Sequence, residues 1–151
     1  MMQGARIVRE ARRWIGTPYR HQGSCREAGC DCLGLVRGVW RAVLGDEPET
    51  VPAYTADWED GAAGGGADAL LLAARRYFNE CAPARALPGA LLLFRPRRHG
   101  PAKHCAILSA PLSAPGRIIH AYWGRQVAET ALTPTWQTRL VAAFHFPLHR
   151  S

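Results

Sequence analysis

The sequence predicts an α+β domain, with N-terminal helices packed on an antiparallel sheet of about five or six strands. In the first half of the chain, apolar residues recur at helical spacings of three and four. After Pro83 the chain breaks into short apolar runs bounded by Pro, Gly or Ser, which is typical of strands. A length of 151 residues, 48% of them hydrophobic, suits one core, so we expect residues 1–151 to form a single domain.

The first helix is expected over residues 3–15, where one stripe is apolar and arginines lie opposite. The stripe consists of Ile7, Ala11, Trp14 and Ile15. Gly16 ends this helix, and Pro18 prevents its continuation. Residues 17–31 contain many turn-forming residues and are expected to be irregular.

The second helix is expected to begin at Cys32 and to end around Gly45. Asp31 directly precedes it and is a good N-cap residue. Residues 46–66 form a loop that ends in a glycine-rich run, which we do not take as a domain boundary. Asp68 then caps a third helix that extends through Asn79.

The second half of the chain is expected to supply the sheet. Its apolar runs are short and are separated by turn-forming residues, as in an antiparallel sheet. The expected strands are 90–94, 105–109, 117–123, 125–129 and 139–146.

Cys32 is the first candidate for chemistry, because a thiol in the first turn of a helix lies at the positive end of the helix dipole. This position favours the thiolate, which is the nucleophilic form of cysteine. The alternative is that Cys32 is a small buried hydrophobic residue, which is the commoner role of a cysteine on an apolar helix. A histidine nearby would favour the catalytic interpretation.

Two histidines are placed to complete such a site. His104 begins one expected strand, just after a turn-rich loop, and His120 lies in the next strand. Side chains on adjacent antiparallel strands can come within hydrogen-bond reach. The sequence therefore predicts a relay in which Cys32 is the nucleophile, His104 the base and His120 the residue that orients the base.

The other cysteines leave a second alternative open. Five cysteines cannot all form internal disulfides, and the spacing of the first three matches no familiar zinc motif. A scattered metal site would need the residues Cys25, Cys30, Cys32, Cys81, His104 and Cys105. We expect neither a metal nor another cofactor.

The formal charge of +7 favours an anionic partner. All but one of the 19 basic residues are arginine, and they are not interleaved with aromatic residues, so we do not expect nucleic-acid binding. No apolar run approaches the length of about 18 residues that a membrane span needs. Charges occupy the first residues where a signal peptide would be apolar, so we expect synthesis in the cytoplasm without a signal peptide.

Five segments occur in an order that resembles a known family. They are Gly16-Thr-Pro-Tyr19, Gly29-Cys-Asp-Cys-Leu-Gly-Leu-Val36, Pro88-Gly-Ala-Leu-Leu-Leu-Phe94, His104-Cys-Ala-Ile-Leu108 and Ile118-Ile-His-Ala121. The chain resembles the NlpC family of papain-like cell-wall peptidases, most closely the small version encoded by phages and gene transfer agents. The resemblance covers residues 3–146 and implies a papain-like NlpC fold.

The resemblance also implies roles for five residues. The nucleophile falls on Cys32, the base on His104 and the third polar residue on His120. Tyr19 matches the tyrosine that helps to position the substrate or the oxyanion, and Asp31 matches the aspartate that helps to shape the substrate pocket. The chain departs from the family pattern at Leu33, which replaces the serine that commonly follows the nucleophile. The pocket contact that this serine usually makes is therefore not expected here.

The resemblance implies a cysteine peptidase that cleaves the γ-D-glutamyl to diamino acid bond of peptidoglycan stem peptides. It also implies delivery by the tail of a phage-like particle, bound to tail or baseplate hub proteins, with action in the periplasm of a target cell. Two alternatives remain open. The first is a catalytically silent structural or assembly protein of the tail. The second is an amidase or acyltransferase with another acyl substrate.

Overall fold

The computed structural model describes residues 2–49, 68–122 and 124–148. The glycine-rich run at 61–66 and most of the expected loop before it lie outside these ranges. Within them the expected α+β fold is confirmed, because helices pack on a six-stranded antiparallel sheet. The helices are α1 (Met2–Arg12), α2 (Cys32–Leu44), α3 (Ala69–Tyr77) and α4 (Pro134–Arg139), and η1 (Pro83–Arg85) is a 3-10 turn.

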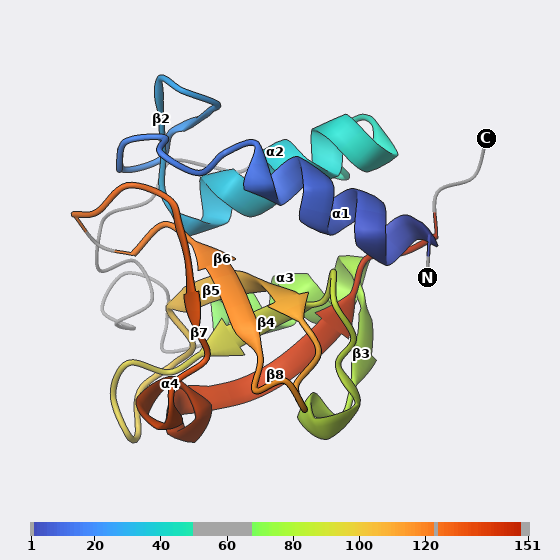
Figure 1. Cartoon of the computed structure of the whole chain (residues 1–151), viewed down its shortest axis with the longest axis vertical. Coiled ribbons are helices and arrows are strands. Elements are labelled where there is room, and N and C mark those ends of the chain that lie inside the picture. The colour runs from blue at the N-terminus through green and yellow to red at the C-terminus, as the bar shows by residue number, and fades with distance from the viewer. Residues whose placement is uncertain (1, 50–67, 123, 149–151) are drawn as a thin grey trace.

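The large sheet has the strand order β3-β8-β4-β5-β6-β7, and every neighbouring pair in it is antiparallel. Its strands are β3 (Asn79–Cys81), β4 (Leu91–Phe94), β5 (His104–Ala110), β6 (Arg117–His120), β7 (Ala128–Ala131) and β8 (Leu140–His145). A separate small hairpin pairs β1 (Ser24–Cys25) with β2 (Gly29–Cys30). Figure 1 shows α1 and α2 together on one side of the curved sheet and α4 at the opposite end.

The packing of α2 against the turn that follows α1 depends on a glycine. A Cβ atom at Gly38 would lie 2.0 Å from the ring of Trp14, so only glycine lets α2 approach this ring so closely. The ring of Trp14 is almost fully buried in the core between the helices and the sheet. This close packing fixes α2, and with it the residue at the start of α2, against the sheet.

Two of the expected helices are shorter than the sequence indicated. The first ends at Arg12, and the chain continues in tight turns whose amides bond three residues back, which leaves Ile15 on the surface rather than in the stripe. The third ends at Tyr77, because Asn79–Cys81 pairs with β8 as an edge strand instead. Tertiary pairing overrides local helical phase at this point.

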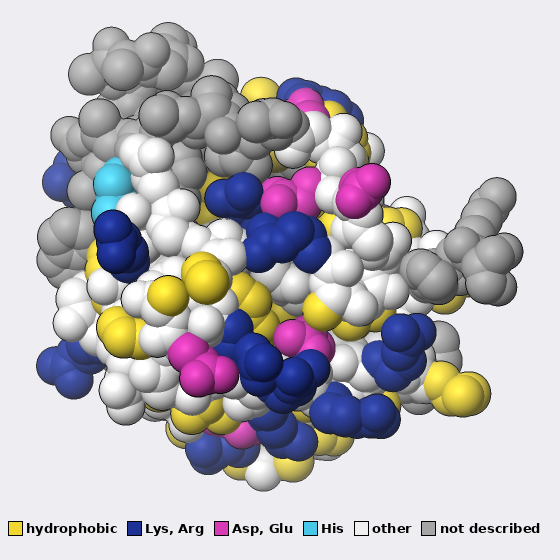
Figure 2. All heavy atoms as spheres, turned by 90° about the horizontal axis from the view of Figure 1, so that it is seen from above, with side chains coloured by type: hydrophobic (Ala, Val, Ile, Leu, Met, Phe, Trp, Pro, Cys, Tyr) yellow, Lys and Arg dark blue, Asp and Glu magenta, His cyan; other side chains and the backbone are white. Residues whose placement is uncertain are grey.

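The charged side chains do not form one continuous basic patch on the side of the molecule that carries α1 and α2. Figure 2 shows Lys and Arg there in separate groups, with carboxylates among them. Arg41 pairs with Glu47 at 2.9 Å, and Arg12 pairs with Glu129 at 3.0 Å. Over the described part of the chain, none of the helices is both long and apolar enough to cross a membrane.

Candidate active site

Cys32 is the first residue of α2, as the sequence predicted. Asp31 is the N-cap, and its Oδ1 accepts a hydrogen bond of 2.7 Å from the backbone N–H of Gly34. Gly34 is required because a Cβ atom there would lie only 1.7 Å from the carbonyl oxygen of Gly23. The motif Asp-Cys-x-Gly therefore encodes a capped helix start that passes directly beneath a turn of the preceding loop.

The second carboxylate oxygen of Asp31 anchors that loop. Its Oδ2 accepts a hydrogen bond of 2.8 Å from the backbone N–H of Gln22, a residue held at a φ of 64°. Asp31 is buried, and both of its oxygens therefore bond backbone amides. The structure gives this side chain the role of fixing the backbone around Cys32, which is consistent with an aspartate that shapes a pocket.

The two predicted histidines meet across β5 and β6. Nε2 of His104 lies 2.8 Å from Nδ1 of His120, so the expected hydrogen-bond reach between them is confirmed. Both side chains are buried, with 6% and 5% of their surface exposed. In the register of the two strands, Ile107 faces Ile119, which makes the two histidines diagonal neighbours on one face of the sheet.

Three aromatic rings surround the histidine pair, and the sequence did not single them out. Trp136 lies 5.1 Å from His104 between ring centroids, Tyr122 lies at 5.4 Å and Phe94 at 5.9 Å. Trp136 comes from α4, a short helix in a segment that sequence periodicity does not reveal. These rings restrict the imidazole of His104 to a narrow range of orientations.

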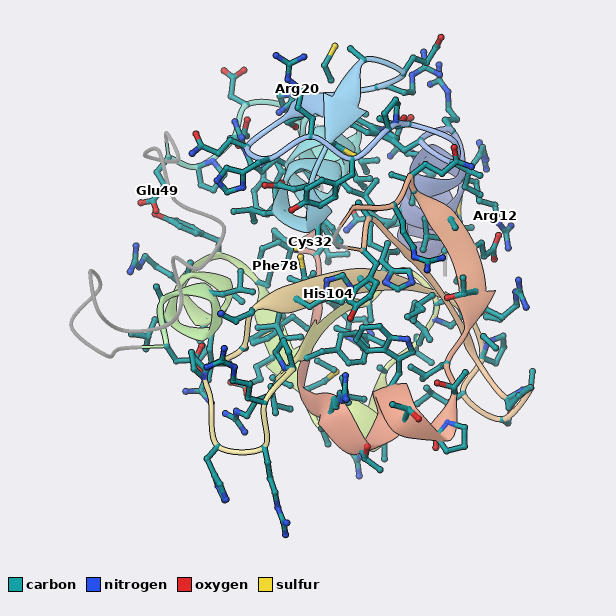
Figure 3. The ribbon with its side chains drawn as sticks, turned by 90° about the vertical axis from the view of Figure 1, so that its left-hand side faces the viewer. Arg12, Arg20, Cys32, Glu49, Phe78 and His104 are labelled. Carbon is teal, nitrogen blue, oxygen red and sulfur yellow. The ribbon has the colours of Figure 1, made fainter. Side chains whose placement is uncertain are left out.

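Cys32, at the start of α2, faces the histidine pair of the sheet. Figure 3 shows its sulfur at the start of α2, directed toward His104 at the start of β5. The pKa of Cys32 is held well below its ordinary value of 9.0, first by a hydrogen bond from the Cys105 thiol and then by the hydrogen bond and charge of His104. Burial and the charge of Asp31 oppose this shift but do not cancel it.

Cys105 is a site residue that sequence reasoning missed. It directly follows His104, and strand alternation turns its side chain to the opposite face, into the core beneath α2. The pKa of Cys105 lies well above its ordinary value, because of its bond to Cys32 and its burial. Cys105 thus remains a thiol and acts as donor to the Cys32 thiolate.

Tyr19 also lies close enough to sense these charges. Burial, followed by the charges of Asp31, Cys32 and Cys30, raises the pKa of Tyr19 to about 12. Its hydroxyl therefore keeps its proton. The sequence resemblance had placed this tyrosine near the site, and the structure brings it there through a backbone bridge between Tyr19 and Cys30.

The remaining cysteines do not gather into a metal site. Cys30 is completely buried, and its pKa is raised to about 12 by burial and by the charges of Asp31 and Cys32. Cys25 is exposed in the small hairpin. In residues 2–49, 68–122 and 124–148, no three His, Cys, Asp or Glu side chains are grouped so as to hold a metal ion.

Known structures with this fold include a domain of a peptidoglycan hydrolase. The NlpC/p60 domain of the peptidoglycan hydrolase SagA is 28% identical, with a TM-score of 0.62, and the match covers 95% of this chain and 98% of that domain. An NLP/P60 family protein from Staphylococcus aureus, described as similar to lipoprotein, is 20% identical with a TM-score of 0.63, over 98% of this chain and 42% of its own.

A further structural relative shows the same arrangement at lower identity. The NlpC/P60 family protein from Bacillus cereus is 18% identical with a TM-score of 0.66, over 95% of this chain and 40% of its own. This chain thus spans about two fifths of the length of the S. aureus and B. cereus proteins. A comparison with curated proteins gives no match.

The sequence comparison with protein families covers most of the chain. Residues 16–145 match the NlpC/P60 family, a span that runs from the glycine after the first helix to the end of β8 and contains Cys32, His104 and His120. The chain therefore belongs to the NlpC/P60 family.

Proposed function

We propose that this protein is a cysteine endopeptidase that hydrolyses an amide bond in the stem peptides of bacterial peptidoglycan. The observation that carries the proposal is the approach of Cys32, at the start of a capped helix, to His104, whose Nε2 is hydrogen-bonded to His120. The family and the hydrolase SagA, whose NlpC/p60 domain has nearly the same extent, support the choice of substrate.

In the first half of the reaction, the Cys32 thiolate attacks the carbonyl carbon of the scissile amide. Nε2 of His104 is bonded to His120, so we assign Nδ1 as the nitrogen that exchanges a proton at Cys32. The protonated imidazole then gives its Nδ1 proton to the leaving amine, and a thioester on Cys32 remains. His120, buried and neutral, accepts from Nε2–H and keeps the ring of His104 in this orientation.

The negative charge that forms on the carbonyl oxygen needs donors. The backbone N–H of Cys32 belongs to the first helical turn, whose amides have no acceptor within the helix. We assign the second donor to the hydroxyl of Tyr19, as the resemblance implies, because the charge of Cys32 is among the causes that raise its pKa to about 12. In the second half, His104 removes a proton from water, and the resulting hydroxide releases the acyl group from Cys32.

The scissile bond that we propose is the γ-D-glutamyl to diamino acid bond, as the resemblance implies. To test this, purified peptidoglycan is digested with the protein and with Cys32→Ala, and the new termini are identified by mass spectrometry. The proposal predicts a new diamino acid amino terminus only with the unaltered protein. If a different amide is cleaved and Cys32 is still required, the proposed bond is wrong but the proposed chemistry stands. If both proteins digest peptidoglycan, the proposed role of Cys32 is refuted.

We also propose that the protein is carried to the wall of a target cell by a phage-like tail, where tail or baseplate hub proteins bind it. This part rests on the resemblance to the small phage and gene transfer agent enzymes. Proteomics of purified particles tests it, and the protein should co-purify with tails at constant stoichiometry. Recovery from every fraction except particles would contradict tail delivery without affecting the proposed chemistry.

A further inference from the structure

Both ring nitrogens of His120 have partners in the fold. Nδ1 lies 2.8 Å from Nε2 of His104, and Nε2 lies 3.1 Å from Oγ1 of Thr130. Thr130 belongs to β7, the edge strand next to β6, and lies diagonally across from His120. The series of interacting side chains Cys32, His104 and His120 thus continues to a fourth side chain, Thr130, which the sequence did not identify.

The protonation state of His120 decides which atoms donate and which accept in these hydrogen bonds. Burial, together with the charge of His104, lowers the pKa of His120 to about 3, so His120 is neutral near pH 7 and carries one N–H. When His104 is protonated, both of its nitrogens are donors, so Nδ1 of His120 must accept. The single proton of His120 then lies on Nε2, where Oγ1 of Thr130 is within reach to accept it.

We propose that Thr130 is a positioning residue that holds His120 in its Nε2–H tautomer and thereby keeps an acceptor in front of His104. Its effect on hydrolysis rests on the proposed function, whereas its effect on the ring tautomer does not. Without an acceptor at Thr130, the proton of His120 moves more readily to Nδ1. An N–H would then face the N–H of protonated His104, and the ion pair between His104 and Cys32 would weaken.

The position of Thr130 decides which variants are informative. The residue is exposed on an edge strand, so a smaller side chain would let water take the place of the hydroxyl. Thr130→Val removes the acceptor but keeps a side chain of the same shape, which excludes water. Valine is also well suited to a strand. Thr130→Ser keeps the hydroxyl. Thr135→Val makes the same chemical change at an exposed residue of α4 and serves as the matched control.

The tautomer is read directly from the ring nitrogen shifts of His120 in a ¹⁵N NMR spectrum of the whole chain at neutral pH. We expect a protonated Nε2 and an unprotonated Nδ1 in the unaltered protein, in Thr130→Ser and in Thr135→Val. In Thr130→Val we expect a mixture of the two tautomers. A protonated Nδ1 in the unaltered protein would overturn the proposal, whether or not the protein cleaves peptidoglycan.

Kinetics provides the second readout. Thr130→Val should lower kcat about three- to tenfold, the loss expected for one net hydrogen bond, and leave KM unchanged. It should also move the pH dependence of Cys32 alkylation, which needs no substrate, toward higher pH. Thr130→Ser should restore both. If Thr130→Val folds with an unchanged Tm and alkylates as the unaltered protein does, or if Thr130→Ser is equally impaired, Thr130 has only a structural role.

Discussion

Cys105, the strand residue that directly follows His104, is the largest of the influences that lower the pKa of Cys32. One short segment of β5 therefore supplies two groups that stabilise the thiolate. His104 reaches it from one face of the strand, and Cys105 reaches it from the core beneath α2. The ionisation of Cys32 thus depends on a buried donor as well as on the histidine.

Cys105→Ala should raise the pKa of Cys32, because it removes the largest stabilising contact of the thiolate. The rate of Cys32 alkylation by iodoacetamide, followed against pH by peptide mass spectrometry, should then rise only at higher pH than in the unaltered protein. Cys105→Ser retains a donor and is the matched control. An unchanged alkylation profile for Cys105→Ala would mean that His104 alone sets the ionisation of Cys32.

The account predicts different losses for different substitutions of His120. His120→Ala removes a hydrogen bond to a charged imidazole, and kcat should fall about ten- to a hundredfold. His120→Asn keeps an acceptor near Nε2 of His104, and its activity should be reduced but measurable. Steady-state kinetics on solubilised peptidoglycan fragments distinguishes the two. Full activity of His120→Ala would reduce this residue to a structural one.

The lowered pKa of His120 predicts how the free energy of unfolding changes with pH. Its pKa falls from the ordinary 6.5 to about 3 on folding, so between these values the unfolded chain binds a proton that the folded chain does not. The free energy of unfolding should therefore fall as the pH is lowered from 6.5 toward 3. Urea unfolding at several pH values measures this. His120→Asn should lose stability less steeply over the same range, and an identical slope would contradict the assignment.

The glycine in the Asp-Cys-x-Gly motif makes a prediction about folding. Gly34→Ala would place a Cβ atom 1.7 Å from the carbonyl oxygen of Gly23, so the start of α2 or the turn above it must move. We expect the free energy of unfolding to fall by about 1–3 kcal/mol. Gly100→Ala, whose Cβ atom would lie 3.2 Å from the nearest heavy atom, is the control. Equal denaturant midpoints for the two variants would contradict the close approach seen here.

Much of the site could be predicted from the sequence because its local signals are strong. A cap residue, a helical stripe and a glycine at fixed spacing locate the start of α2 at Cys32. Alternation and turn residues place His104 and His120 on adjacent strands. These features depend on residues close together in the chain, and the structure has them where they were expected.

The parts that were missed depend on contacts between distant residues. Cys105 looks like any apolar strand residue until α2 is packed over it. Thr130 lies in a short strand whose side chains are only partly buried or exposed, and only the pairing of β6 with β7 brings it to His120. Trp136 belongs to a helix of six residues, which is too short to show a period. Nothing in the local sequence distinguishes these residues from ordinary core or surface positions.

Selective alkylation of the cysteines tests the central claim, that Cys32 is a thiolate activated by His104, most directly. The native protein is treated with limiting iodoacetamide at slightly acid pH, and modification of each cysteine is followed by peptide mass spectrometry. Cys32, although partly buried, should be modified well before the exposed Cys25, and His104→Ala should weaken this preference. Modification of Cys25 first, or of both at equal rates, would contradict the account.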